Sequence, residues 1–416
     1  MDSLIARFAG ETVRTALDDT RIVVIQGARQ VGKSTLARQI SAERNGLVVS
    51  LDRDEAWRFA LDDPVGFVNQ RPDGLLVIDE AQRAPALLRA LKLAVDQDQR
   101  PGRYLVTGSA DLLGLDATHE SLAGRAETVP LYSLSQGELE GGRESFVDRA
   151  FAGQLDRGRA GGLTRADYLE RACRGGYPEA LARASQRRRA AWHSQYVTHI
   201  VRRDAEDVSN LSRLASLPQL LAMIAAQSGG EMVWNRLAND TEMPRRTLDP
   251  YVQLLQLLYL IHVVPAWSRN LSARQIKAPK VFCLDSGLAA GLLGVEPEGL
   301  APTSPSGLAG GLLETFVAGE LRRQLSWSSQ SASLHHWRDR NGHEVDFVLE
   351  APDGRIVAVE VKATASLTPK DLGGLARLGE LLGEQFRVGV VLHTGSASQQ
   401  VGRRLFALPL DTLWRQ

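Results

Sequence analysis

Short apolar runs rich in β-branched residues recur through the first third of the chain, separated by longer and more polar stretches. Each run has the composition of a buried strand in a parallel sheet. The predicted strands cover residues 22–25, 47–51, 74–80, 104–109 and 127–131. Before them, apolar side chains recur at helical spacing and predict an amphipathic helix that leads into the first strand. These side chains are Leu4, Ile5, Phe8, Val13 and Leu17.

The loop after the first strand carries the most specific motif of the chain. It reads GARQVGKS and matches the pattern G-x-x-x-x-G-K-[ST] at every fixed position. The glycines let the backbone curl so that its N–H groups face a phosphate chain, and the next helix adds its positive N-terminal end. Lys33 can reach the β- and γ-phosphates, and the Ser34 hydroxyl can bind Mg²⁺. The predicted nucleotide-binding residues are Gly27, Ala28, Arg29, Gln30, Val31, Gly32, Lys33, Ser34 and Thr35.

Later strands end in the polar residues that phosphoryl transfer needs. One apolar run ends at Asp79 and Glu80. Asp79 would hold Mg²⁺ through a water molecule or Ser34, and Glu80 would orient or deprotonate the attacking water. Thr107 and Ser109 end another predicted strand, where they either sense the nucleotide by hydrogen bonding or only cap the strand. The set predicts a site that binds a nucleoside triphosphate and hydrolyses it.

Arg125 closes the sequence SLAGR, just before the last predicted strand of this region. There it would project from the edge of the domain, away from its own nucleotide. It can complete the site of a neighbouring subunit as an arginine finger. The alternative is an arginine in an ordinary surface salt bridge.

Composition and charge narrow the classes of function. The formal net charge of the 416 residues is zero, so contact with nucleic acid must use local basic patches. The two cysteines, Cys173 and Cys283, lack the spacing of metal ligands. The first residues do not resemble a secretory signal, and no apolar run is long enough to span a bilayer. We therefore expect a cytoplasmic protein without a zinc site, a disulfide framework or a membrane partner.

The middle of the chain predicts a helical lid region over residues 141–218. Its first part, residues 141–163, is rich in Gly, Arg and Asp and predicts a loop or insertion. Residues 175–178 read Gly-Gly-Tyr-Pro and predict a turn between two lid helices. Residues 186–210 predict a charged helix, whose arginines form either a solvated face or a contact with nucleic-acid phosphates.

Residues 219–279 predict the helix, turn, helix and strand of a winged-helix domain. Pro244 would begin the second helix, with Arg245 and Arg246 on its first turn. Basic residues at that place suit a recognition helix in a DNA groove, although a winged helix can also serve protein contacts alone. The candidate DNA contacts of the chain are Arg187, Arg188, Arg189, Arg245 and Arg246.

The last part of the chain, residues 280–416, predicts a second α/β domain that contains a Pro/Ser/Gly-rich linker at residues 302–307. Glu360 and Lys362 share one face of a predicted strand, and Asp346 lies on the adjacent strand of a hairpin. Two carboxylates can hold Mg²⁺, and a nearby lysine can position or activate a hydrolytic water. The same side chains can instead form only an ion pair in a degenerate site.

The motifs LLVIDEAQ, YLVTGSA and SLAGR, in this order after the phosphate loop, resemble those of AAA-family ATPases. With the segment GGYPEAL, they are similar to a prokaryotic group of AAA ATP-binding proteins that carry a C-terminal domain of uncharacterised function. The resemblance implies a five-stranded parallel sheet flanked by helices over residues 1–140. It also implies ATP and Mg²⁺ as cofactors, ATP hydrolysis, and assembly into an oligomer such as a hexamer.

The order of elements after residue 308 resembles the restriction-endonuclease-like core of the PD-(D/E)xK nucleases. Asp346, Glu360 and Lys362 carry the match, and Glu314 stands where these nucleases often have an acid in the preceding helix. The resemblance implies Asp346, Glu360 and Glu314 as Mg²⁺ ligands and Lys362 as a catalytic residue. Val345 replaces the proline that precedes the first acid in the motif.

The predicted fold class is therefore α/β, with an AAA-type parallel sheet, a helical lid and winged-helix region, and a restriction-endonuclease-like domain. Three hypotheses follow for the function. The first is an oligomeric ATPase that couples hydrolysis to DNA binding and remodelling, on branched or duplex DNA. The second is a nucleotide-gated switch with an inactive nuclease-like domain, which the zero net charge favours. The third is a Mg²⁺-dependent, structure-specific DNA nuclease.

Overall fold

The computed structural model describes residues 4–109, 122–155, 162–208, 214–270, 274, 277–301 and 307–415, except for the side chains at 201–204 and 206–208. Its contacts divide the chain into two compact units. The first comprises residues 1–134, 204–210 and 257–259. The second comprises residues 135–203, 211–256 and 260–416. The domain boundaries expected at residues 140, 218 and 279 remain predictions.

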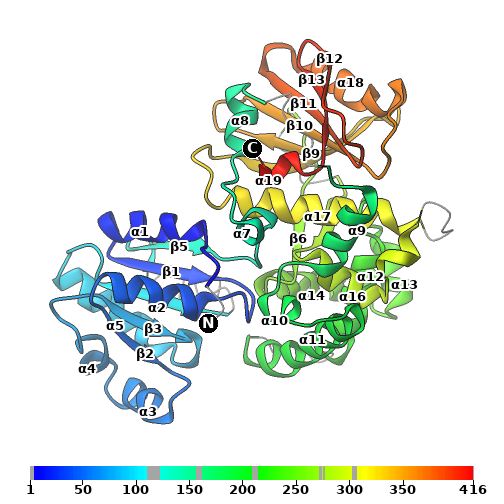
Figure 1. Cartoon of the computed structure of the whole chain (residues 1–416). Coiled ribbons are helices and arrows are strands. Elements are labelled where there is room, and N and C mark those ends of the chain that lie inside the picture. Colours follow the sequence, from blue (N-terminus) through cyan, green and yellow to red (C-terminus); the bar gives the residue numbers. More distant parts are fainter. Residues whose placement is uncertain are drawn as a thin grey trace. The chain divides into compact units, whose positions relative to one another are not determined.

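A five-stranded parallel sheet forms the centre of the first unit (Figure 1). Its strands, in the spatial order β2-β3-β4-β1-β5, confirm the predicted sheet. Their bounds are β1 Ile22–Gln26, β2 Leu47–Ser50, β3 Leu76–Asp79, β4 Tyr104–Gly108 and β5 Ala126–Pro130. The helices of this unit are α1 Ala9–Asp19, α2 Lys33–Glu43, α3 Asp54–Asp62, α4 Pro64–Val68, α5 Ala86–Gln97 and the 3₁₀ turn η1 Ala81–Arg83.

Alternate residues of the central strands face a buried apolar core on one side of this sheet. Ile22, Ile78 and Val106 share a single cluster with Leu87 and Leu91 of α5. Since all five side chains are almost fully buried, the sheet and α5 hold each other in place by apolar burial. The carboxyl ends of the parallel strands therefore meet at one fixed edge of the sheet, where the candidate site lies.

The opening helix is shorter than predicted. α1 begins at Ala9, and Leu4 and Ile5 precede it with exposed fractions of 66% and 40%. The prediction that they belong to its apolar face was therefore wrong. A physical reason is the anchoring of Arg7, whose guanidinium donates to backbone carbonyls of the phosphate loop and of Tyr132. The chain ahead of Phe8 follows these contacts instead of extending the helix.

The second unit begins with helices and a two-stranded sheet. The segment expected as a loop at residues 141–163 contains the buried helix α8, so that prediction was wrong: Phe146 and Phe151 give α8 an apolar face. Helix, turn, helix and strand follow in the predicted order from α13 to β6. The elements are α7 Gln136–Glu140, α8 Phe146–Ala152, α9 Arg165–Arg174, α10 Pro178–Leu181, α11 Gln186–Val208, α12 Leu217–Ala226, α13 Trp234–Asp240, α14 Arg245–Leu257, β6 Ile261–Val264, β7 Lys280–Cys283, α16 Ser286–Leu293 and α17 Leu308–Gln324.

A separate six-stranded mixed sheet, in the order β12-β13-β11-β10-β9-β8, ends the chain. The predicted hairpin of β9 and β10 lies inside it. Most of the linker expected at 302–307 lies outside the described residues. The elements are β8 Ser333–Arg338, β9 Glu344–Glu350, β10 Ile356–Lys362, α18 Gly373–Leu382, β11 Phe386–His393, β12 Gln399–Gly402, β13 Leu405–Pro409 and α19 Thr412–Arg415.

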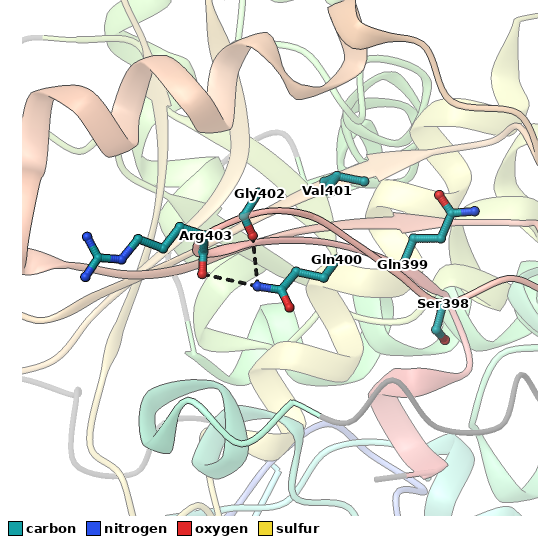
Figure 2. A pocket seen from close by; sticks show the side chains of 6 residues that line it. All are labelled: Ser398, Gln399, Gln400, Val401, Gly402 and Arg403. Carbon is teal, nitrogen blue, oxygen red and sulfur yellow. Dashed lines mark hydrogen bonds between the residues drawn. The ribbon is translucent and has the colours of Figure 1, made fainter.

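The edge strand β12 was not predicted, and its sequence explains why. Gln399, Gln400 and Val401 are exposed, so the strand has no apolar alternation that would mark a buried face. The side-chain amide of Gln400 donates to the carbonyls of Gly402 and Arg403 at 3.0 and 3.3 Å and closes the hairpin to β13. Figure 2 shows these residues along the hairpin, and together with Ser398 they line an open hollow to which none of them contributes a carboxylate.

The predicted turn after α9 is a close contact between two backbones. A Cβ atom on Gly287 would lie 2.7 Å from the Cα atom of Gly175. Gly175 also has a positive φ of 67°, which side chains disfavour. The carboxylate of Asp285 accepts from the Gly176 N–H at 2.9 Å and from the Leu288 N–H, so it fixes the turn to the start of α16. The Gly-Gly-Tyr-Pro segment therefore holds the end of α9 against the start of α16.

We predict that Gly287→Ala destabilises the chain by about 1–3 kcal/mol, because the new methyl group must displace backbone atoms. Gly310→Ala is the matched control, since a Cβ atom there meets no atom within 4 Å and should stabilise α17 by up to about 1 kcal/mol. Thermal unfolding followed by circular dichroism measures both changes. A Gly287→Ala midpoint at or above that of Gly310→Ala would contradict the close contact.

Candidate functional site

The phosphate loop joins β1 to α2 in a conformation that its glycines permit. A Cβ atom on Gly27 would lie 2.0 Å from the carbonyl oxygen of Leu131, so no other residue fits there without a shift. Gly32 has a φ of 101°, and Gln30 also lies in the left-handed region at 60°. The curled loop predicted from the motif is therefore present, directly before the first turn of α2.

Lys33 begins α2 and is buried inside this loop. Its ammonium group donates to the carbonyl oxygens of Gly27 at 2.9 Å and of Ala28 at 2.8 Å. The phosphate oxygens of a nucleotide carry negative charge and would accept hydrogen bonds from this ammonium group more strongly than neutral carbonyl oxygens do. The loop thus places a lysine at the N-terminus of α2, where an anion would be attracted by both.

Arg7 holds the loop from outside and was missed by sequence reasoning. Its guanidinium donates to the carbonyl of Val31 at 2.6 Å and to that of Tyr132 at 2.6 Å. It therefore ties the loop to the segment after β5. No motif could have indicated this role, because the contact joins residues that lie far apart in the sequence.

The other predicted loop residues include Arg29, Gln30 and Thr35, which are partly or fully exposed.

The predicted metal-binding and catalytic residues meet at the carboxyl ends of β3 and β4. Asp79 Oδ1 accepts a hydrogen bond from Ser34 Oγ at 2.8 Å and another from Thr107 Oγ1 at 2.5 Å. The backbone N–H of Glu80 donates to Thr107 Oγ1 at 3.2 Å. Carboxylate and hydroxyl oxygens are the ligands that Mg²⁺ prefers, so Ser34 and Asp79 fit this ion. The sequence-predicted group Ser34, Asp79, Glu80 and Thr107 is thus brought together.

Glu80 occupies an unusual backbone conformation, and its side chain is held by a neighbour. Its φ and ψ of 60° and 44° lie in the left-handed region. Its carboxylate accepts a hydrogen bond from the amide of Gln82, which also donates to Ser109 Oγ at 2.9 Å. Gln82 was missed as a site residue, although it stands in the motif LLVIDEAQ only two positions after Glu80.

Arg125 lies near the edge strand β5 and pairs with Asp96 of α5 at 2.6 and 3.1 Å. The hydrogen bond from this guanidinium lowers the pKa of the Asp96 carboxyl. The contact matches the salt-bridge alternative within one chain. A role toward a neighbouring subunit remains a prediction, and Ser121, the first residue of the SLAGR motif, lies outside the described residues.

The nuclease-like residues also lie together, at the β9–β10 hairpin. Asp346 Oδ2 accepts from the Val361 N–H at 2.9 Å, and Glu360 Oε2 accepts from the Asp346 N–H at 3.3 Å. Lys362 donates to Glu360 Oε1 at 2.7 Å. These bonds link adjacent strands through their side chains, as the shared face of the hairpin predicted.

A second lysine, which sequence reasoning missed, occupies the centre of this group. Lys280 Nζ lies 2.8 Å from Asp346 Oδ1 and 3.3 Å from Glu314 Oε2, and its side chain is only 4% exposed. Sequence reasoning missed it because Lys280 on β7 lies 66 positions before Asp346 on β9, so no local motif joins the two residues. Although burial lowers it, the carboxylates of Asp346 and Glu314 raise the pKa of Lys280 overall. An ammonium group therefore takes the place between two acids that a metal ion would need.

The carboxylates around Lys280 do not fit a divalent cation. Burial, reinforced by the charge of Asp346, raises the pKa values of Glu314 and Glu360. Both oxygens of Asp346 and of Glu360 already accept hydrogen bonds. Among the described residues, no group of three or more His, Cys, Asp or Glu side chains is arranged to hold a metal ion. These contacts are the ion pairs of the degenerate alternative, and nuclease activity at this site remains a prediction.

The candidate DNA contacts lie on helices of the second unit. Arg187, Arg188, Arg245 and Arg246 are exposed, and no ion pair to them occurs in the described part of the chain. Arg245 lies over the ring of Trp234, 5.7 Å from its centroid. Arg189 instead donates to the Gln186 side chain and to the Arg183 carbonyl. The side chains of residues 202 and 203, on the same helix α11, lie outside the described residues.

None of the helices that the structure describes is long and apolar enough to cross a membrane.

Comparisons with protein families match three parts of the chain. Residues 19–140 match a family described as an AAA domain. Residues 165–299 and 309–413 match two domains of unknown function, DUF8612 and DUF4143. The AAA match covers the phosphate loop, Asp79, Glu80 and the Thr107 strand. The restriction-endonuclease-like identity of the last domain remains a prediction.

Relatives over most of the chain are found in mycobacteria. Uncharacterized protein Rv2008c of Mycobacterium tuberculosis is 30% identical over 363 residues, which are 86% of this chain and 74% of that protein. Uncharacterized protein Mb2031c of Mycobacterium bovis matches to the same extent.

Solved structures give weaker matches. The Thermotoga maritima RuvB Holliday junction branch migration motor has 18% identity and a TM-score of 0.27, over 62% of this chain and 89% of that one. AMPPCP-bound DnaA from Aquifex aeolicus has 15% identity and a TM-score of 0.28, over 60% and 87%. The chain belongs to the family of the two mycobacterial proteins, and its residues 19–140 match the AAA domain family.

Proposed function

We propose that the protein is a Mg²⁺-dependent ATPase of the AAA family that works as an oligomer and couples ATP hydrolysis to the binding and remodelling of DNA. One observation carries the ATPase proposal. Ser34 and Thr107 share the carboxylate of Asp79, and Glu80 follows it directly on the same edge of the sheet. A loop with a buried lysine, a metal-binding pair and an adjacent carboxylate is the set that phosphoryl transfer requires.

The side chains around the loop suggest how the reaction proceeds. Lys33 would exchange the carbonyls of Gly27 and Ala28 for phosphate oxygens of ATP. Ser34 and Asp79 would hold Mg²⁺, which when bound neutralises part of the phosphate charge. Glu80 would take a proton from the water that attacks the γ-phosphorus, while the bond from that phosphorus to the β,γ-bridging oxygen breaks. The products are ADP and inorganic phosphate.

The DNA part of the proposal depends on the exposed arginines. Arg245 and Arg246 fall on the first turn of α14, where a recognition helix meets a groove. Arg187 and Arg188 stand on the first turn of α11. Because no described carboxylate pairs with them, they are available to phosphates. Assembly into an oligomer, with Arg125 completing a neighbour's site, is part of the same proposal.

A second candidate function is a nucleotide-gated switch with an inactive nuclease-like domain. The observation that favours it is Lys280, which lies between Asp346 and Glu314. In this proposal the last domain binds a partner without cutting DNA, and ATP turnover is slow. The two candidates share the ATP site and differ in whether DNA changes its turnover.

We predict that Glu80→Gln lowers kcat for ATP by about 100-fold or more, because an amide cannot accept the proton of the attacking water. Affinity for ATP should remain, since Lys33 and the loop are unchanged. Phosphate release and calorimetric ATP titration measure the two quantities. Glu55→Gln, an exposed glutamate in the first turn of α3, is the matched control.

In the motor proposal, Glu80→Gln with ATP should also retain DNA, whereas a switch would hold ATP without any dependence on DNA. Turnover of Glu80→Gln equal to that of the unchanged chain would remove Glu80 from the mechanism.

We predict that Arg245→Ala and Arg246→Ala each weaken binding to duplex DNA and reduce the salt dependence of the affinity by about one phosphate contact. Fluorescence anisotropy over a range of salt concentrations measures both effects. Arg377→Ala is the control, because this exposed arginine of α18 pairs with Glu380 at 3.2 Å. If the unchanged chain binds no DNA even at low salt, the DNA part of the proposal is rejected while the ATPase part stands.

We predict that the chain does not cut DNA in Mg²⁺, because Lys280 and Lys362 neutralise the acids that would hold the ion. Incubation with linear, branched and supercoiled DNA tests this. Cleavage that Lys362→Ala abolishes, with ATPase activity unchanged, would show instead that the site is an active nuclease.

A further inference from the structure

The amide of Gln82 joins two polar groups at the edge of the first sheet. Its Nε2 donates one hydrogen bond to the Glu80 carboxylate and another to Ser109 Oγ, at 2.9 Å in the latter case. A carboxylate only accepts hydrogen bonds, so the atom that faces Glu80 must be the NH₂ group of the amide. Both hydrogens of this group are therefore used, and they link the end of β3 to the end of β4.

Gln82 sits in a turn that is held on several sides. It is the central residue of η1, and Ala81 beside it is 1% exposed. The indole N–H of Trp57 donates to the carbonyl of Arg83 at 3.1 Å. The guanidinium of Arg83 also pairs with Asp52 at 2.8 Å. A side chain on a turn fixed by such contacts has little freedom, and this gives its amide a defined position.

The order of the strands places the two hydrogen bonds of Gln82 beside the proposed ATP site. β4 lies between β3, which ends beside Glu80, and β1, which leads into the phosphate loop. Ser109 follows β4 directly, so an amide bound to Ser109 draws the carboxylate of Glu80 toward the strand next to the loop. Thr107 of β4 already holds the backbone of Glu80 at 3.2 Å. The backbone and the carboxylate of Glu80 are thus both fixed from β4.

The remaining atom of the amide is an unused acceptor. Gln82 Oε1 is buried and has no hydrogen-bond partner among the residues that the structure describes. Buried acceptors without a partner are uncommon, and a bound water is one way to satisfy them.

We propose that Gln82 is a positioning residue for ATP hydrolysis, which orients the Glu80 carboxylate and couples it to Ser109. This inference rests on the proposed role of Glu80 as the proton acceptor. Gln82 itself forms no bond to the nucleotide and transfers no proton. Its amide holds the ionised carboxylate in one orientation through a charge-assisted hydrogen bond, which is among the stronger kinds in proteins.

The test compares two substitutions that both remove the NH₂ donor of Gln82 but leave side chains of different shape. Gln82→Ala removes the side chain, whereas Gln82→Glu keeps its shape and replaces the NH₂ donor by an oxygen that repels Glu80. We expect both to lower kcat for ATP by about 10- to 100-fold, with Gln82→Glu at least as impaired. The KM and the Kd for ATP should stay within about threefold of the unchanged chain, because the phosphate loop is untouched.

A role in packing alone would give the opposite order, since the isosteric glutamate would preserve it. A Gln82→Glu variant with the kcat of the unchanged chain would therefore overturn the proposal. In a Glu80→Gln background, adding Gln82→Ala should change the residual turnover by less than about threefold, because the carboxylate to be positioned is already absent. A full further loss in that background would also overturn it.

These measurements separate failure of this inference from failure of the proposed function. If the unchanged chain releases no phosphate from ATP in Mg²⁺, the proposed ATPase function fails and Gln82 has nothing to position. If the chain is active and depends on Glu80 but tolerates both Gln82 substitutions, the ATPase proposal stands and the positioning role is wrong.

Discussion

The hydrogen bonds to the carboxylate of Asp79 hold the first site together. One oxygen of this side chain accepts from Ser34 at the start of α2 and from Thr107 of β4. Thr107 in turn accepts from the backbone N–H of Glu80, whose left-handed conformation is thereby supported. The apolar packing of the sheet brings the strand ends to one edge, and these bonds set the register of the side chains there. Without Asp79, three elements would lose their common polar contact.

The sequence predicted those parts of the site whose chemistry is local. The phosphate loop, Asp79 and Glu80 lie in short segments whose residue types and order follow from what a triphosphate requires. The parallel sheet was equally accessible, because its buried strands are unbroken apolar runs. Arg7 and Lys280 were missed for a physical reason, and so was the contact of Gln82 with Ser109. Their roles depend on contacts made in the folded chain, such as that between Lys280 and Asp346, which are 66 positions apart.

The predictions of secondary structure failed where the burial of a segment differed from what its sequence pattern indicated. β12 is exposed and polar, so it has none of the alternation that marks a strand at a buried face. α8 begins inside a stretch rich in Gly, Arg and Asp, yet Phe146 and Phe151 bury it. Leu4 and Ile5 have helical spacing but no surface to pack against, since α1 begins at Ala9. In each case tertiary contacts outweighed the local pattern.

The two carboxylate groups of the chain differ in what a metal ion would have to displace. At Asp79 the partners are hydroxyl groups, and each such hydrogen bond contributes only about 0.5–1.5 kcal/mol, or somewhat more to a charged group. Ser34 can also turn its oxygen toward the ion, so little is lost when the ion binds. At Asp346 the partner is the buried ammonium of Lys280. Moving it away would leave an unpaired buried charge, which costs about 3–5 kcal/mol. The same side-chain type therefore accepts from hydroxyl groups that an ion could displace in the AAA domain, and forms a buried ion pair in the last domain.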